Sequence, residues 1–328
     1  MPKIRLFING FGRIGRAAFK IAFEDSDIEI VGINDIYEFS QMAYLLKYDS
    51  VYGVYEKDVK LLDDRLIVED KSIKLHSQTD PKLLNLEGVD LFLDCSGIFL
   101  DRLSNEIRLK MGAKKVLIST PVGEDIPTYV MDINHHEYRG EKIISNSSCS
   151  ANAILPIMNI IDKKLKITSG AFTMYHSYTA YQKLLDVKHY SKDIRRARSA
   201  TQNIQPLQSS AATECAKFFP NLKSSLSAVS VRVPVSAVTL YELHFKIQKS
   251  YQKEDLVKLI KSNKNDYPYL DLTLEPLVSR DFIKNDNMAV VDLNLIDIIG
   301  KNLIKISAWQ DNEWGYAKQL IRMAKEIG

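Results

Sequence analysis

The sequence has few cysteines, little excess charge and no long apolar run. Its three cysteines, Cys95, Cys149 and Cys215, cannot build a disulfide framework, because at least one would be left unpaired. The 44 basic and 41 acidic residues leave a net charge of +3, far below the bias of a dedicated nucleic-acid-binding protein. Charged residues interrupt the apolar stretches well short of the roughly 20 residues that span a bilayer. We therefore expect neither a nucleic acid nor a membrane as partner.

What remains is an ordinary globular composition, with 45% hydrophobic and 26% charged residues. The length of 328 residues favours about two domains, at ~150 residues each. The N-terminal stretch MPKIRLFINGFGRIGR has no apolar core followed by a cleavage site. We expect a cytoplasmic, two-domain protein with reduced thiols.

The first 35 residues have the pattern of a dinucleotide-binding unit. Residues 3–9 predict a buried strand, and Gly10-Phe11-Gly12-Arg13-Ile14-Gly15 leads into a helix that ends near Glu24. A second strand at 28–33 ends at Asn34-Asp35. This order of strand, Gly-x-Gly-x-x-Gly, helix, strand and acid is the dinucleotide fingerprint in its full context.

Each residue of the fingerprint has a mechanical reason. Gly10 permits a tight turn, Gly12 lets the backbone approach a pyrophosphate, and Gly15 lets the helix pack on the strand. The helix N-terminus offers free N–H groups to phosphate. Asp35 is placed to hold a ribose 2′-OH and would repel a 2′-phosphate, which favours NAD over NADP. The alternative is that the three glycines merely serve a turn.

The rest of the first half alternates between strand and helix signals. Strands are predicted at 66–69, 72–76, 90–96 and 115–120, with a helix at 101–111. This alternation predicts an α/β domain with a doubly wound, mostly parallel sheet. Ser96-Gly97 either forms a small-residue loop beside the cofactor or is only a turn.

Cys149 lies between a polar segment and a helix. The segment SNSSCSAN at 145–152 precedes AILPIMNIIDKKL, and its small hydroxyl and amide residues are N-capping types. A thiol at a helix N-terminus is expected to have a lowered pKa and to react as thiolate. Cys95 and Cys215 have no such context, and we expect them to be buried and inert.

A second candidate catalytic group follows a strand at 167–175. His176 at the end of this strand either serves as the base for Cys149 or is a structural histidine. The cation-rich stretch 183–198 is either an anion site or a solvated face. Arg232 follows a strand-like run, and strands at 238–248 and 288–294 with a helix at 254–262 indicate an α+β domain with a mainly antiparallel sheet.

Six motifs, in order, resemble phosphorylating glyceraldehyde-3-phosphate dehydrogenases: INGFGRIGR, SNSSCSAN, HSYT, RRAR, RVP and DNEWGY. The resemblance runs from residue 4 to the C-terminus. It implies an NAD-binding domain at 1–148, completed by a helix at 312–328, and a catalytic domain at 149–311. It also implies a homotetramer in which the segment 178–202 lies near neighbouring cofactors.

The resemblance also implies roles for single residues. Cys149 corresponds to the nucleophile that forms a thiohemiacetal and then a thioacyl enzyme, His176 to its base, and inorganic phosphate to the acyl acceptor. The implied NAD contacts are Gly10, Phe11, Gly12, Arg13, Ile14, Gly15, Asp35, Ser96, Gly97, Ser119, Asn312 and Tyr316. The implied ligands of the phosphorylated aldehyde and of phosphate are Ser148, Ser150, Thr179, Arg195, Ser209 and Arg232, and Ser210 is a further candidate because of its hydroxyl. No metal is implied.

Several positions depart from the family pattern and leave alternatives open. Ser150-Ala151 replaces Thr-Thr, Ser209-Ser210 replaces Thr-Gly, and Val235-Ser236-Ala237 lacks the usual Thr and Asn. Tyr181 stands near the expected substrate phosphate. Lys188 stands where NAD-specific members have Pro, and a lysine tolerates a 2′-phosphate. The altered anion sites also suit an erythrose-4-phosphate dehydrogenase, which hydrolyses its acyl enzyme with water. A third alternative is a catalytically retired nucleotide-binding regulator.

Overall fold

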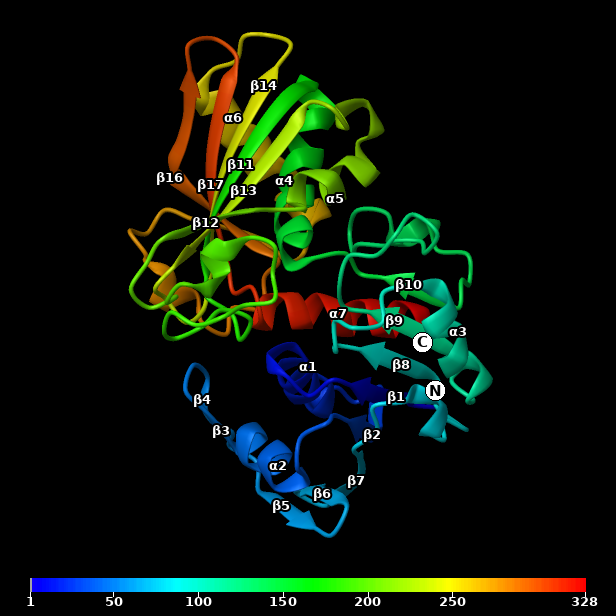
Figure 1. The fold of residues 1–328 in the computed structure, drawn as a ribbon. Helices are drawn as coiled ribbons and strands as arrows, with labels where there is room; N and C mark the ends of the chain where they lie inside the picture. Colours follow the sequence, from blue (N-terminus) through cyan, green and yellow to red (C-terminus); the bar gives the residue numbers. More distant parts are fainter. Residues whose placement is uncertain (1) are drawn as a thin grey trace. The chain divides into compact units, whose positions relative to one another are not determined.

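The computed structural model describes residues 2–328, which form two compact units (Figure 1). The first unit extends to Ser148 and also includes Tyr316–Gly328. The second unit is Cys149–Gly315. The last segment of the chain thus belongs to the same unit as the first strands.

The first unit is built on an eight-stranded sheet of order β10-β9-β8-β1-β2-β7-β6-β5. Neighbouring strands from β10 to β7 are parallel, and the pairs β7–β6 and β6–β5 are antiparallel. The strands are β1 (Ile4–Asn9), β2 (Ile28–Asn34), β5 (Val59–Leu62), β6 (Arg65–Val68), β7 (Lys71–His76), β8 (Leu91–Asp94), β9 (Lys115–Ile118) and β10 (Ile143–Ser145). The other elements are α1 (Arg13–Glu24), α2 (Phe39–Lys47), α3 (Arg102–Lys110), α7 (Trp314–Ile327), the short pair β3 (Tyr48–Asp49) and β4 (Gly53–Val54), and the 3-10 turns η1 (Pro81–Leu83) and η2 (His135–Glu137).

The central strands of this sheet are apolar on both faces. Leu6 and Ile8 on one side of β1 and Phe7 on the other are all buried, and so is every residue of β8. A parallel sheet covered by helices on both faces requires such continuous apolar runs. This explains why short unbroken runs of Ile, Leu and Phe in the sequence became central strands.

The second unit is built on a seven-stranded sheet of order β12-β13-β11-β14-β17-β16-β15. Among the described residues, the neighbouring strands of this sheet are antiparallel except for the two parallel pairs β11–β13 and β15–β16. The strands are β11 (Ile167–Ser177), β12 (Gln205–Gln208), β13 (Leu226–Val233), β14 (Thr239–Ile247), β15 (Leu270–Thr273), β16 (Ala289–Ile299) and β17 (Leu303–Gln310). Its helices are α4 (Cys149–Leu165), α5 (Ala211–Phe218) and α6 (Lys253–Asn263), with the turns η3 (Ile194–Ala197), η4 (Pro220–Leu222), η5 (Lys264–Asp266) and η6 (Ser279–Phe282).

One face of this second sheet is buried. In β14 the residues Thr239, Tyr241, Leu243 and Phe245 are all buried, whereas the residues between them are partly or fully exposed. This alternation has the period of two that a half-buried strand shows. Helices α4, α5 and α6 lie on one side of the sheet (Figure 1).

The predicted fold class is confirmed, with differences at the edges. Sequence reasoning missed the short helices α2 and α5 and the strands β5, β12 and β15, each of which lies at an edge of its sheet. The last helix begins at Trp314 rather than at residue 312. The carboxylate of Asp311 accepts hydrogen bonds from the backbone N–H groups of Glu313 and Trp314, at 3.1 and 2.9 Å, so residues 312 and 313 form the turn before the helix.

Candidate active site

The glycine-rich segment forms the turn between β1 and α1. Gly10 has a φ of +87°, and a Cβ there would lie 2.6 Å from the backbone N of Ser96. A Cβ on Gly15 would lie 2.0 Å from the carbonyl oxygen of Gly10, whereas one on Gly12 would meet nothing within 4 Å. Gly10 and Gly15 are therefore required by packing. Gly12 leaves its backbone open to a ligand.

The start of α1 fits a phosphate group. Gly12 precedes the helix without a side chain to cap it, and the first turn contains no acidic residue. The positive end of the helix dipole is thus not compensated by a carboxylate of the helix. Asp35 accepts hydrogen bonds from the backbone N–H of Phe11 at 2.5 Å and of Ile36 at 2.7 Å, so its carboxylate is held beside the turn. This arrangement fits a dinucleotide.

A buried polar network joins the ends of β1, β2 and β8. Asn34 Nδ2 donates to Asn9 Oδ1 at 2.8 Å, and Asn9 Nδ2 donates to Asp94 Oδ1 at 3.1 Å. The backbone N and the Oγ of Ser96 donate to the same Asp94 oxygen, at 2.9 and 2.6 Å. Burial raises the pKa of Asp94. The network fixes the loop of Ser96 and Gly97. In the sequence, the polar residues at the ends of the three buried strands indicated such a network.

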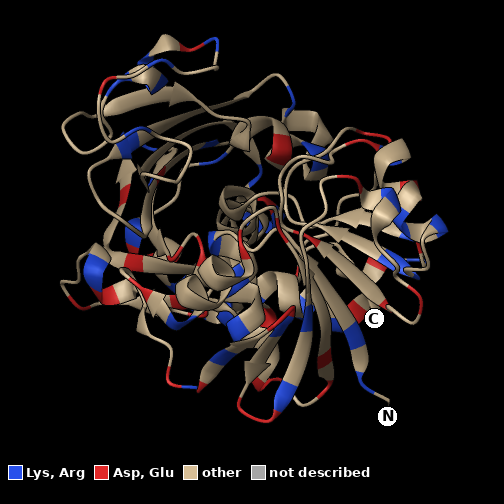
Figure 2. Ribbon diagram, turned by 60° about the horizontal axis from the view of Figure 1, so that its bottom comes forward, with Lys and Arg blue, Asp and Glu red and all other residues tan. Residues whose placement is uncertain are grey.

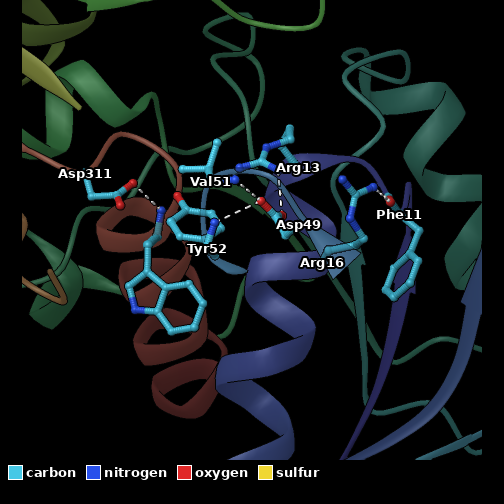
Figure 3. A network of polar contacts seen from close by, with 8 residues as sticks. Phe11, Arg13, Arg16, Asp49, Val51, Tyr52 and Asp311 are labelled. Atoms are coloured by element: carbon cyan, nitrogen blue, oxygen red, sulfur yellow. Dashed lines mark hydrogen bonds and ion pairs between the residues drawn. The ribbon is translucent and has the colours of Figure 1, made fainter. Parts of the chain in front are cut away.

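Arg13 is engaged with a loop that sequence reasoning missed (Figure 3). Its Nη1 lies 2.6 Å from Asp49 Oδ2, and Asp49 Oδ1 accepts the backbone N–H groups of Val51 and Tyr52 at 2.8 and 3.0 Å. Burial alone would raise the pKa of Asp49, but the hydrogen bonds from Arg13 and the loop outweigh it, and the pKa is lowered. The Arg13 side chain therefore orders this loop.

Tyr316 connects α7 to the segments that follow β9 and β10 in the first unit. Its hydroxyl lies 2.7 Å from the carbonyl oxygen of Ser119 and 2.9 Å from that of Ser147. Tyr316 is buried, and Ser119 follows β9 directly. Ser119 and Tyr316 were both predicted as cofactor contacts. In the structure they form a hydrogen bond with each other.

In the second unit, Cys149 and His176 lie on elements of the predicted kind. Cys149 is the first residue of α4, and His176 is the penultimate residue of β11, directly opposite Arg232 of β13. Arg232 Nη1 contacts His176 Nδ1 and donates to the carbonyl oxygen of Ser177 at 3.1 Å. Nδ1 of His176 lies 2.7 Å from that same oxygen. No hydrogen bond joins Cys149 to His176 in the part of the chain that the structure describes.

The prediction that the helix start lowers the pKa of Cys149 is wrong. Burial raises the pKa of this thiol, and the charge of Arg232 and hydrogen bonds from Ser150 offset the rise only in part. Burial and the nearby Arg232 lower the pKa of His176 to about 3. Burial also lowers the pKa of Arg232 to about 10. In this state the site holds a thiol and a neutral imidazole.

The other two cysteines are protonated as well. Burial and the neighbouring Asp94 raise the pKa of Cys95 to about 12, and burial raises that of Cys215 further. Cys215 is fully buried and Cys95 partly exposed. The raised pKa values fit the prediction of unreactive thiols, whereas the predicted burial holds for Cys215 and not for Cys95.

Asn312 has an oriented amide. Its Oδ1 accepts hydrogen bonds from Ser177 Oγ at 3.0 Å and from Thr239 Oγ1 at 3.4 Å. Because both hydroxyls use the oxygen, the NH₂ group is the end that remains to donate. Sequence reasoning missed Ser177, although its place next to His176 was a signal.

The predicted anion ligands are mostly bonded to near neighbours in the chain. Thr179 Oγ1 donates to Gln182 Oε1 at 2.8 Å, and Ser209 Oγ accepts the backbone N–H of Ala211 at 3.1 Å. Arg195 donates to both carboxylate oxygens of Asp193, at 2.9 and 2.8 Å. Ser210 directly precedes α5, and Ser148 is the last residue of the first unit before Cys149. Ser150 and Arg232 act on Cys149 itself.

Three further observations concern partners. Among residues 2–328, no three or more His, Cys, Asp or Glu side chains gather as metal ligands would. Within the same range, every helix is too short or too polar to cross a membrane. Basic and acidic residues are interspersed along the ribbon (Figure 2).

Comparison with known proteins gives matches over nearly the whole chain. Residues 4–102 match the family described as "Glyceraldehyde 3-phosphate dehydrogenase, NAD binding domain", and residues 148–312 match the corresponding "C-terminal domain". A glyceraldehyde-3-phosphate dehydrogenase of Helicobacter pylori is 39% identical over 333 aligned positions, which cover 98% of both chains. A chloroplastic one of Arabidopsis thaliana is 38% identical over 330 positions, covering 98% of this chain and 83% of the relative. One of Buchnera aphidicola is 35% identical over 328 positions, covering 99% and 98%.

Proposed function

The chain belongs to the glyceraldehyde-3-phosphate dehydrogenase family of oxidoreductases, and from this premise we propose that it oxidises glyceraldehyde 3-phosphate with NAD and inorganic phosphate to 1,3-bisphosphoglycerate. One observation carries the proposal. Cys149 begins a helix, acts electrostatically on Arg232, and shares this cation with His176. A thiol, a base and a fixed cation are the groups needed to add a thiol to an anionic aldehyde.

In the proposed reaction, the Cys149 thiol gives its proton to His176 and its sulfur attacks the aldehyde carbon, forming a thiohemiacetal. The carbonyl oxygen of Ser177 selects the tautomer of His176, because this oxygen can accept a hydrogen bond but cannot donate one. When Nδ1 of His176 donates to this oxygen, Nε2 is left unprotonated and ready to take the proton. The backbone N–H of Cys149, at the start of α4, would donate to the developing oxyanion.

Arg232 links substrate binding to the basicity of His176. In the structure its guanidinium contacts His176 Nδ1 and competes for the Ser177 carbonyl oxygen. A phosphate group on the substrate draws the guanidinium to itself, with Thr179 as a second ligand. The imidazole then loses the adjacent cation, and its pKa rises from about 3 towards the range in which it accepts the thiol proton.

The groups that would hold the cofactor fit a dinucleotide. Gly12 and the start of α1 would bind the pyrophosphate, Asp35 a ribose hydroxyl, and the Asn312 NH₂ group the nicotinamide carboxamide. A bound nicotinamide would supply the hydride acceptor for oxidation of the thiohemiacetal to a thioester on Cys149, and His176 is the base that would take the hydroxyl proton. Inorganic phosphate then attacks this thioester, giving the acyl phosphate and releasing the Cys149 sulfur.

We propose NAD rather than NADP because of Asp35. Its carboxylate is fixed by two backbone amides beside the glycine turn, and it would repel a 2′-phosphate. Lys188 of the second unit is the residue that would favour NADP. Titration of the protein with each cofactor decides, and tighter binding of NADP would contradict the argument from Asp35.

A second candidate is oxidation of erythrose 4-phosphate with hydrolysis of the acyl enzyme. The bidentate pairing of Arg195 with Asp193 favours it, because this arginine must leave Asp193 before it binds inorganic phosphate. We expect the phosphate-dependent reaction to dominate, since the pair is exposed and exposed ion pairs are weak.

One assay distinguishes the two reactions. NADH formation is followed with glyceraldehyde 3-phosphate and with erythrose 4-phosphate, each with and without inorganic phosphate. Strong phosphate dependence with the three-carbon aldehyde is the expected result. Phosphate-independent turnover that prefers the four-carbon sugar would establish the hydrolytic reaction, and no turnover with either would favour a retired regulator.

We also propose that the chain assembles as a homotetramer. Leu184, Leu185, Tyr190 and Ile194 are 71–80% exposed, and they lie in the segment 178–202 that the family resemblance places near the cofactors of neighbouring subunits. A run of exposed large apolar side chains is typical of an interface. Sedimentation analysis tests this, and a monomer at micromolar concentration would contradict it.

A further inference from the structure

The segment 96–101, which follows β8, begins against the glycine-rich turn. A Cβ on Gly10 would lie 2.6 Å from the backbone N and 2.7 Å from the Cα of Ser96, so the two backbones are in contact. Asp94 holds Ser96 through its backbone N and its Oγ, and Ser96 Oγ also accepts the backbone N–H of Ile98 at 3.3 Å. The conformation of this segment therefore shapes one side of the proposed dinucleotide site.

Helix α3 holds the other half of the segment through Asn105. This side chain is fully buried, and its Nδ2 donates to the backbone carbonyl oxygens of Phe99 at 3.0 Å and of Asp101 at 2.8 Å. Asp101 also caps the helix, because its carboxylate accepts the backbone N–H of Ser104 at 2.8 Å. The end of the segment is thus tied to the first turns of α3.

Arg108, three residues further along α3, contacts the ring of Phe99. Its Cζ lies 3.9 Å from the ring centroid of Phe99 and 5.6 Å from that of Phe92, which belongs to β8. Arg108 is fully buried, and its Nη1 donates to the backbone carbonyl oxygen of Ser104. A desolvated guanidinium is attracted to the face of an aromatic ring. Arg108 therefore fixes the Phe99 ring close to the sheet.

Packing alone does not explain these two polar side chains. Asn105 Oδ1 and the Nε and Nη2 atoms of Arg108 are buried and have no hydrogen-bond partner among residues 2–328. Burying such atoms costs free energy, and apolar side chains would fill the space without this cost. Burial lowers the pKa of Arg108, and the charges of Asp94 and Asp101 oppose the decrease. What apolar side chains would not supply is the hold on the backbone and the ring of Phe99.

We propose that Asn105 and Arg108 are positioning residues for the cofactor, which hold the segment 96–101 in the conformation that binds NAD. Asn105 fixes the backbone at Phe99, and Arg108 fixes the Phe99 ring. The two residues lie three positions apart and so share one face of α3. The proposal rests on the proposed function in taking a dinucleotide as the ligand beside this segment. It gives neither residue a contact with the cofactor itself.

The first test is the affinity for NAD, measured by calorimetry on the whole chain. For Asn105→Leu and for Arg108→Met we expect the Kd of NAD to rise about tenfold, equivalent to ~1.4 kcal/mol. In the turnover assay the KM for NAD should rise by a similar factor, whereas kcat at saturating NAD should not change. Leucine is close to asparagine in size and also removes the unpartnered Oδ1. Asn105→Leu therefore separates a loss of positioning from a loss of stability.

The matched control is Arg102→Met on the same helix. The Arg102 side chain is 41% exposed and contacts Asp125. A Kd for Asn105→Leu equal to that of the wild type would overturn the proposal, and so would an equal rise in the control. If Arg108→Met does not fold, Phe99→Leu takes its place, because it removes the ring next to the guanidinium at a half-buried position.

Hydrogen exchange of the backbone amides of 97–101, measured without cofactor, is the second test. We expect faster exchange in Asn105→Leu and in Arg108→Met than in the wild type, because the segment loses a contact that orders it. Unchanged exchange would overturn the hold of α3 on this segment even if the wild type binds NAD. A wild-type chain that binds no NAD would instead contradict the proposed function, and with it the role in cofactor binding.

Discussion

Replacement of Arg322 by methionine removes an ion pair that holds α7 within the first unit. Nη1 and Nη2 of Arg322 each lie 2.9 Å from one carboxylate oxygen of Asp132, and Nη1 also donates to Gln319 Oε1 at 2.7 Å. The two charged side chains are only 17% and 9% exposed. Loss of one partner of a buried pair costs about 3–5 kcal/mol, and the partial exposure of Arg322 places the expected loss of unfolding free energy near 3 kcal/mol.

Urea unfolding followed by far-UV circular dichroism measures this loss. With an m value of ~3 kcal/mol per molar urea, the midpoint should fall by roughly 1 M. The control is Lys325→Met on the same helix, whose ion pairs with Asp25 and Asp27 are at the surface and contribute little. A midpoint for Arg322→Met within error of the wild type, or equal to that of the control, would refute the reasoning.

Three further predictions concern the site. Gly12→Ala should fold like the wild type, because its Cβ meets no atom, but it should bind NAD more weakly in a fluorescence titration. Gly15→Ala should unfold at a lower urea concentration, because its Cβ collides with the backbone of Gly10. His176 has a pKa of about 3 in the folded protein against 6.5 as a free group, so the unfolded chain binds a proton first as the pH falls. Stability should therefore decrease by about 2 kcal/mol between pH 7 and pH 5, and His176→Gln should remove most of this dependence in urea titrations. Cys149→Ser should abolish NADH formation and retain NAD binding in calorimetry; surviving turnover would disprove the assignment of the nucleophile.

Features set by neighbours along the chain were predictable from the sequence. The spacing of Gly10, Gly12 and Gly15 predicted the turn, and the polar segment before an apolar run predicted a helix start at Cys149. Both follow from local backbone geometry, because capping and tight turns involve residues only a few positions apart. The central strands were predictable for the same reason, because each is a short apolar run of consecutive residues.

Features set by strand register were not predictable. Gln310 stands opposite Thr239, and Arg232 opposite His176, through pairing of residues 56 to 71 positions apart. A shift of one residue in either pairing would turn these side chains to the other face. The pKa of Cys149 was misjudged for a related reason. The helix start is a local feature, whereas the burial that dominates this pKa comes from the whole unit.

The return of residues 316–328 to the first unit has a consequence for biosynthesis. These residues leave the ribosome only after all of 149–315, which at 5–20 residues per second means a delay of roughly ten to thirty seconds after Ser148. During this time the nascent first unit lacks Leu320, Ile321 and Met323, which are buried in the finished protein. The second unit is contiguous and can fold as it emerges. The first unit therefore begins earlier and is completed later, so its uncovered apolar surface is the part of the nascent chain that most needs a chaperone.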